Sequence, residues 1–159
     1  MNTRYPLALA VFCALGTVAA QAQPSPFIGT WKLDLAKSKF DPASIKPKAS
    51  ETLNIQAAGS GVKVTIDGTD AKGAPTHTEY TVATLDGKDY PLKGSANYDS
   101  VAIKSIDANT RMVVNKKGSS VVRMLRDIVS KDGKSATFDV VGYNAQGVAF
   151  HEVAIFHKQ

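Results

Sequence analysis

The feature that most constrains the fold is a succession of short segments in which apolar and polar residues alternate. In one of them Val62, Val64 and Ile66 alternate with polar residues, which is the period of a strand with one buried face. Turn-forming residues separate these segments roughly every 8–14 positions. No stretch after the first 30 residues shows a helical period. The pattern therefore predicts an all-β domain of about ten short strands.

Short links between consecutive strands decide the expected topology. Asp86-Gly87 and Asp132-Gly133 are turn signals of the kind that joins hairpin strands. Strands joined by short links usually lie side by side, so the chain is expected to form an up-and-down antiparallel meander. Closing such a sheet removes its unpaired edges. We therefore expect a lipocalin-like barrel of about 8–10 strands.

The segment Phe27–Leu35 supplies the expected closure of the barrel. Trp31, Leu33 and Leu35 alternate with polar residues, as in a strand with a buried face. Trp31 is the only tryptophan of the chain, and we expect it to lie inside the barrel and block one end. Gly29 is expected to let the backbone bend or pass close to a neighbour.

The N-terminal residues resemble an export signal. Arg4 precedes an apolar run that ends at Ala20-Gln21-Ala22, and a basic start, a short apolar core and a small-x-small end are typical of a cleaved secretory signal. We expect a signal peptide over residues 1–22 and a barrel domain over 23–159, placing the protein in the periplasm or outside the cell. An uncleaved anchor and a lipid on Cys13 are the alternatives. The apolar run is short for a membrane span, and the bulky Phe12 before Cys13 argues against the lipid.

Composition narrows the classes of partner. Cys13 is the only cysteine, so the mature chain is expected to hold together without a disulfide. The formal net charge of +5 is mild, and the chain has no basic run interleaved with aromatic residues, which argues against nucleic-acid binding. We expect a monomer with no membrane span.

Several segments together resemble known small barrels of the calycin type, the lipocalins and fatty-acid-binding proteins. The matching segments are Gly29–Leu33 for the first strand, Leu125–Val129 with Asp132-Gly133-Lys134 for a late strand and its turn, and Val153–Lys158 for the closing strand. The stretch from Trp31 to Phe40 also resembles a group of uncharacterised exported bacterial proteins. The resemblance implies a barrel whose cavity holds a small hydrophobic ligand; a solid core is the alternative.

Arg126 is the first candidate for a ligand contact. It is expected to point inward on a strand face whose other members are apolar: Val122, Met124 and Ile128. A buried guanidinium needs a partner, and an arginine at the matching position of fatty-acid-binding proteins helps to hold the ligand carboxylate. The alternatives are stacking on Trp31 or pairing with an acid such as Glu152.

The other expected ligand contacts are Tyr80, Met112, Phe138, Phe150 and Phe156. The closing strand of fatty-acid-binding proteins usually adds an arginine and a tyrosine to the carboxylate site. Ala154 and Phe156 occupy the matching positions here. The resemblance therefore implies a more apolar or neutral ligand than a free fatty acid.

Metal, haem and catalytic chemistry have little support in the sequence. The three histidines, His77, His151 and His157, show no metal-ligand spacing. His151 lies where haem-binding barrels called nitrobindins carry their iron ligand, but their glycine-rich segment after the tryptophan is absent. No nucleophile elbow occurs, so we expect no cofactor and no enzymatic activity.

A different class of function is also open. Small barrels with a Gly-x-Trp opening serve as inhibitors of exported proteases in Gram-negative bacteria, although those usually carry a disulfide. A filled core with an exposed apolar patch near Phe27 and Phe40 would favour such an interaction module over a ligand-binding protein.

Overall fold

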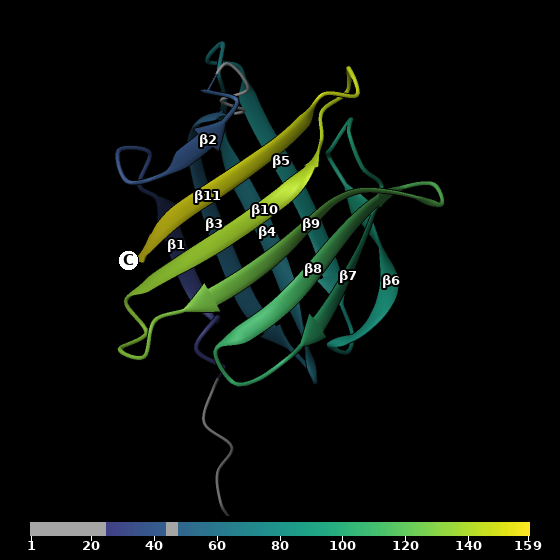
Figure 1. The fold of residues 1–159 in the computed structure, drawn as a ribbon. Coiled ribbons are helices and arrows are strands. Elements are labelled where there is room, and N and C mark those ends of the chain that lie inside the picture. Colours follow the sequence, from purple (N-terminus) through teal and green to yellow (C-terminus); the bar gives the residue numbers. More distant parts are fainter. Residues whose placement is uncertain (1–24, 44–47) are drawn as a thin grey trace, which may run out of the picture.

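A computed structural model describes residues 25–43 and 48–159 of the chain. The expected signal peptide, including Cys13, lies outside the described residues. The described part consists of antiparallel strands joined by turns (Figure 1). The strands are β1 (Gly29–Leu33), β2 (Lys39–Asp41), β3 (Lys48–Ala58), β4 (Gly61–Asp70), β5 (Pro75–Val82), β6 (Asp86–Lys93), β7 (Ser100–Ser105), β8 (Thr110–Lys117), β9 (Ser120–Val129), β10 (Ser135–Tyr143) and β11 (Ala149–Lys158). None of the described residues forms a helix long and apolar enough to cross a membrane.

The strands close into a barrel, as the sequence predicts. From β3 to β11 each strand pairs with its successor in the chain, which is the expected meander. β1 pairs with β3 on one side and with β11 on the other, where Trp31 faces Lys158 and Leu33 faces Phe156. These pairings complete a ring of ten strands, β1 and β3–β11, and confirm the lipocalin-like, all-β class.

The segment after β1 contains a short strand, β2, that the alternation of apolar and polar residues did not predict. β2 pairs with the first half of β11, where Phe40 faces Glu152. β1 covers only the second half of the same edge, so β2 occupies backbone groups that would otherwise be unpaired. Before β2, the Ser38 hydroxyl donates to Asp34 O at 2.7 Å and accepts from the Ile155 amide at 3.0 Å. The pairing with β11 therefore defines β2 more than its own sequence does.

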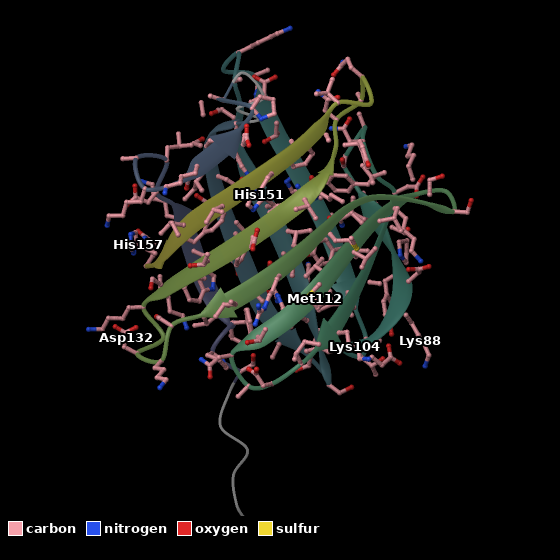
Figure 2. The ribbon with its side chains drawn as sticks, in the orientation of Figure 1. Lys88, Lys104, Met112, Asp132, His151 and His157 are labelled. Atoms are coloured by element: carbon pink, nitrogen blue, oxygen red, sulfur yellow. The ribbon has the colours of Figure 1, made fainter. Side chains whose placement is uncertain are left out.

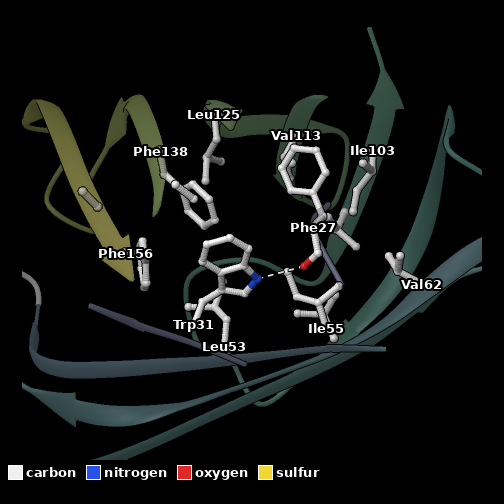
Figure 3. Close-up of a cluster of buried hydrophobic side chains, with 14 of the residues drawn as sticks. Phe27, Trp31, Leu53, Ile55, Val62, Ile103, Val113, Leu125, Phe138 and Phe156 are labelled. Carbon is white, nitrogen blue, oxygen red and sulfur yellow. Dashed lines mark hydrogen bonds between the residues drawn. The ribbon is translucent and has the colours of Figure 1, made fainter. Parts of the chain in front are cut away.

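One end of the barrel is closed by Trp31 and Phe27, which are 1% and 5% exposed. The Trp31 indole Nε1 donates a hydrogen bond of 2.8 Å to Phe27 O (Figure 3). The indole is therefore satisfied as well as buried.

Gly29 allows the side chain of Lys158 to cross this closed end. Its φ is +136°, a conformation that side-chain-bearing residues rarely adopt. A Cβ there would lie 2.6 Å from Lys158 Cε. Lys158 Nζ instead reaches 5.0 Å from the centre of the Trp31 ring and donates to Pro26 O at 3.1 Å. The absence of a Cβ at Gly29 thus allows Lys158, in β11, to pass over Trp31 and bond to Pro26, which precedes β1.

Candidate functional site

A cavity of about 550 Å³ occupies the barrel interior. Residues of β2, of the adjoining ends of β4 and β5, of the β6–β7 loop and of the β10–β11 turn line its outer part. These segments lie at the end of the barrel opposite the one where the chain enters β1 (Figure 1). We call this end the mouth and define it by Asp41, Asp70, Pro75, Ser95 and Asn144. The barrel is therefore hollow and open on one side.

Much of the cavity wall is apolar. Phe138 and Phe156, on β10 and β11, pack with ring centres 4.7 Å apart. The apolar lining residues include Leu53, Ile66, Leu92, Val113, Leu125, Phe138, Val140, Phe150, Ala154 and Phe156. These side chains alternate with outward-facing residues along their strands. Such a wall favours an apolar ligand over water.

A buried ion pair lines the cavity beside the closed end. Arg111 on β8 and Asp127 on β9 are 3% and 1% exposed. Arg111 Nε donates to Asp127 Oδ2 at 2.8 Å, and its guanidinium carbon lies 4.4 Å from the centre of the Phe27 ring. Burial raises the pKa of Asp127, and the Arg111 charge opposes that rise. The pair therefore lines the inner end of the cavity, which we call the floor, and Arg111 also contacts Phe27, one of the two residues that close the barrel.

A second arginine faces the cavity nearer the mouth. Arg123 on β9 donates from Nε to Asn115 Oδ1 at 2.8 Å, and its guanidinium carbon lies 4.6 Å from the centre of the Tyr98 ring. Burial acts to lower the pKa of Arg123, but nearby tyrosines and carboxylates raise it overall. Arg123 therefore stays charged, with an amide and an aromatic ring as neighbours.

A lysine and two carboxylates form a third polar group on the cavity wall. Lys48 Nζ donates to both Glu51 oxygens at 3.1 Å and lies 3.0 Å from Glu152 Oε1. Burial alone would lower the pKa of Lys48, but the two carboxylates raise it overall. Glu152 is 2% exposed, so this ion pair is largely withdrawn from water.

Tyr80 carries a hydroxyl on the cavity wall. It lies on β5 and lines the cavity. Burial raises its pKa to about 12, because the phenolate would lose its hydration. Tyr80 is therefore a neutral group that can donate or accept one hydrogen bond at neutral pH.

The structure places four of the six expected ligand contacts on the cavity. Tyr80, Phe138, Phe150 and Phe156 line it. Arg126 and Met112 face each other across β9 and β8, and neither is among the lining residues. Arg126 is exposed and Met112 is half-buried, and Figure 2 shows the position of Met112 on β8. The prediction that these two point into the barrel was wrong.

The strand register explains this error. Directly paired residues of antiparallel strands lie on the same face of the sheet. Phe138, which faces the cavity, pairs with Asp127 rather than with Arg126. Asp139, on the outer face, is the partner of Arg126. A one-residue difference in register therefore puts Arg126 outside and the Arg111–Asp127 pair inside.

Sequence reasoning missed most of the polar groups that line the cavity. These are Lys48, Glu51, Tyr98, Arg111, Asn115, Arg123 and Asp127. Both faces of β9 carry apolar residues together with charges, so the alternation could not show which face is buried. The inward orientation expected for Phe138 would identify the inner face of β9, but only once the residue of β9 that pairs with Phe138 is known.

The histidines bond to acids at or near the barrel surface. His151 is exposed on β11, and its Nε2 lies 2.6 Å from Asp139 Oδ1. His157 Nε2 lies 3.2 Å from Asp34 Oδ2, and His77 Nδ1 lies 2.7 Å from Asp67 Oδ1. Figure 2 shows His151 and His157 along the same strand. Residues 25–43 and 48–159 contain no cluster of three or more potential metal ligands.

Comparison with solved structures supports the architecture. The zebrafish ileal bile acid-binding protein, in its complex with cholic acid, superposes with a TM-score of 0.51 and 13% sequence identity. The alignment covers 85% of this chain and all of the zebrafish chain. No protein-family model matches the chain, and no curated protein is significantly similar to it. The likeness shows a shared calycin-type fold and nothing finer.

Proposed function

We propose that this protein is an exported binding protein that encloses a small hydrophobic ligand in its barrel. The observation that carries the proposal is the open cavity of about 550 Å³, whose wall combines a cluster of apolar and aromatic side chains with buried polar groups. Enclosing roughly 300 Å² of apolar ligand surface would contribute about 7 kcal/mol toward binding. The solved neighbour with this fold is itself, by its title, a bile acid-binding protein.

The interaction module is the weaker proposal. The observation that would favour it was a filled core with an apolar patch near Phe27 and Phe40. Phe27 is 5% exposed and Phe40 lines the cavity. Haem binding through His151 is weaker still, because its Nε2, which would have to ligate the iron, lies 2.6 Å from Asp139 Oδ1.

Binding inside the barrel can be tested with the neutral dye Nile red. We expect its fluorescence to rise when the mature protein is added, and native mass spectrometry to detect co-purified lipid. Thr78 is half-buried on β5 and lines the cavity. Thr78→Trp should therefore weaken dye binding by filling the space.

The matched control is Thr81→Trp on the same strand. Thr81 is exposed and pairs with the exposed Lys63, so its replacement should leave dye binding unchanged. A protein that binds neither dye nor lipid, or equal effects of the two variants, would contradict enclosure in the cavity. Export is tested by the intact mass of the secreted chain, which should begin at Gln23.

A further inference from the structure

The Arg111 guanidinium has hydrogen-bonding capacity that the protein does not use. Within residues 25–43 and 48–159 its hydrogen bond runs from Nε to Asp127 Oδ2, so the two Nη atoms have no protein partner there. The sealed polar atoms without a partner in this part of the chain are Asp127 Oδ1 and Glu152 Oε1, so the Nη atoms reach open space. Arg111 lines the cavity and is 3% exposed. Its Nη donors therefore face the cavity at the floor.

A second group of donors faces the cavity nearer the mouth. Arg123 Nε donates to Asn115 Oδ1 at 2.8 Å, and a guanidinium can only donate. The Asn115 amide therefore gives its oxygen to Arg123 and keeps Nδ2 as a donor. Asn115 is 2% exposed and lines the cavity together with Arg123. Among the described residues, Asn115 Nδ2 and the Arg123 Nη atoms have no hydrogen-bond partner, and none of these atoms is sealed.

The strand register separates the two donor groups by an apolar step. Arg111 and Asn115 are four residues apart on β8, which is about 13 Å along a strand. Val113 lies between them on the same face and pairs with Leu125 of β9. Val113 and Leu125 are buried and line the cavity (Figure 3). The wall therefore presents donors at two positions with apolar surface between them.

The permanent charges of the inner wall balance one another. The three cations and three carboxylates are Lys48, Arg111, Arg123, Glu51, Asp127 and Glu152. Two further lining carboxylates, Asp41 and Asp70, belong to the mouth. A ligand that brings a negative charge would therefore leave carboxylates in excess, and charge is costly where water is scarce. An uncharged oxygen acceptor avoids that cost and still gains a hydrogen bond from a charged donor, which is stronger than one between neutral groups.

We infer that the cavity takes an uncharged, elongated apolar molecule that carries carbonyl oxygens at two positions. One carbonyl accepts from Arg111 Nη at the floor, and the other accepts from Arg123 Nη or Asn115 Nδ2 nearer the mouth. The apolar chain between them lies against Val113 and Leu125. Ketone, ester and amide groups share this acceptor chemistry. The inference rests on the proposed function and specifies the polar chemistry of the ligand.

Four probes with the same chain length test the assignment: 2,11-dodecanedione, 2-dodecanone, 11-oxododecanoic acid and dodecylamine. Each is titrated against the Nile red complex at neutral pH. One added hydrogen bond from a charged donor corresponds to about a tenfold gain in affinity. We expect the dione to bind about tenfold more tightly than dodecanone, and more tightly than the keto acid and the amine.

Two variants test the two donor groups separately. Arg111→Met combined with Asp127→Leu removes the floor donors without leaving an unpaired carboxylate, and Arg123→Met removes the charged donor nearer the mouth. Each should lower the preference for the dione over dodecanone by about tenfold, because one donor group is lost. The ratio of the two affinities within one variant cancels the different solubilities of the probes. Arg126→Met is the matched control and should leave the ratio unchanged, because Arg126 is exposed on the same strand and points away from the cavity.

The outcomes separate this inference from the proposed function. If Nile red binds but dodecanone binds as tightly as the dione, the two-point assignment is wrong while ligand enclosure stands. A keto acid or an amine that binds as tightly as the dione would likewise contradict the uncharged ligand. The inference is also wrong if Arg123→Met and a folded Arg111→Met/Asp127→Leu variant both leave the ratio unchanged. If neither the dye nor any probe binds, the proposed function fails together with the inference.

Discussion

The two ends of the barrel differ in how they use the same kinds of residue. At the closed end Trp31 is 1% exposed, and the Arg111–Asp127 pair is withdrawn from water beside it. At the mouth Tyr143 is 58% exposed, and ion pairs such as Lys117–Asp99 lie in water. At the closed end the aromatic ring and the ion pair are buried and stabilise the fold. At the mouth the corresponding groups are exposed and leave the cavity accessible. Substitutions of like chemistry at the two ends should therefore have unequal effects.

The largest difference is expected for the aromatic residues. Trp31→Ala removes a buried ring and its hydrogen bond to Phe27, so the free energy of unfolding should fall by about 4 kcal/mol. Tyr143→Ala, at the mouth, should change it by less than about 0.5 kcal/mol. Urea unfolding followed by far-UV circular dichroism measures both. Similar losses at the two positions would remove the distinction between a packed floor and an open mouth.

The second-largest difference between the two ends is expected for the ion pairs. Arg111→Met leaves the Asp127 carboxylate buried without its partner and should cost about 3 kcal/mol of stability. Adding Asp127→Leu should restore most of that loss, because the uncompensated charge is gone. At the mouth, Lys117→Met should cost less than about 0.5 kcal/mol, since that pair is exposed. A double variant no more stable than Arg111→Met alone would show that Arg111 stabilises chiefly through its packing on Phe27.

Two glycines with positive φ provide a finer comparison. Gly29 has φ +136° and contacts Lys158, whereas Gly73 in the β4–β5 turn has φ +84° and open space where a Cβ would lie. Gly29→Ala should cost about 2 kcal/mol, from backbone strain and displacement of Lys158. Gly73→Ala should cost about 1 kcal/mol, from the left-handed conformation alone. Thermal unfolding measures both losses of stability. A larger loss at Gly73 would mean that the closed end of the barrel adjusts to a side chain at Gly29.

The smallest expected effect is a loss of folding stability at alkaline pH, which comes from Lys48 near the mouth. Glu51 and Glu152 raise the pKa of Lys48 above 10.5 against the opposing effects of burial and Arg123. A raised pKa means that the folded state holds the proton more tightly, so the stabilisation is present below 10.5 and lost as the pH rises through the folded value.

Comparing wild type with Lys48→Met tests that dependence. Between about pH 8 and about pH 11.5, wild type should lose more unfolding free energy than the variant. Urea titrations at the two pH values measure the difference, and other groups that titrate in this range are common to both proteins. An equal loss in both would show that Lys48 does not contribute through its charge.

The strands and their order could be predicted because they depend on local chemistry. The turn signal at Asp132-Gly133 coincides with a turn in which Gly133 has a positive φ. Asp86-Gly87 instead begins β6, and the connection between β5 and β6 lies just before it. Leu125–Val129, which was expected to belong to a late strand, lies within β9. β2 was not predicted, because its pairing with β11 is a long-range contact. Short segments of this kind obtain their structure from a partner rather than from their own propensity.

The cavity was predictable in outline and not in its chemistry. The aromatic contacts Phe138, Phe150 and Phe156 were found because large apolar side chains favour the inner face whatever the register. Arg126 was chosen over Asp127 because both faces of β9 contain apolar residues and charges. The pairing of Phe138 with Asp127 resolves the ambiguity. The sequence of one strand alone does not specify which residues it pairs with on its neighbour.

The sequence by itself determined that this chain forms a meander of short strands with Trp31 on a buried face, because alternation and turn chemistry act over a few neighbouring residues. Only the tertiary structure decided which charges share the interior. Arg111 and Asp127 lie on different strands and meet through the register of β8 and β9. That register places a compensated ion pair, and not a free arginine, at the floor of the cavity.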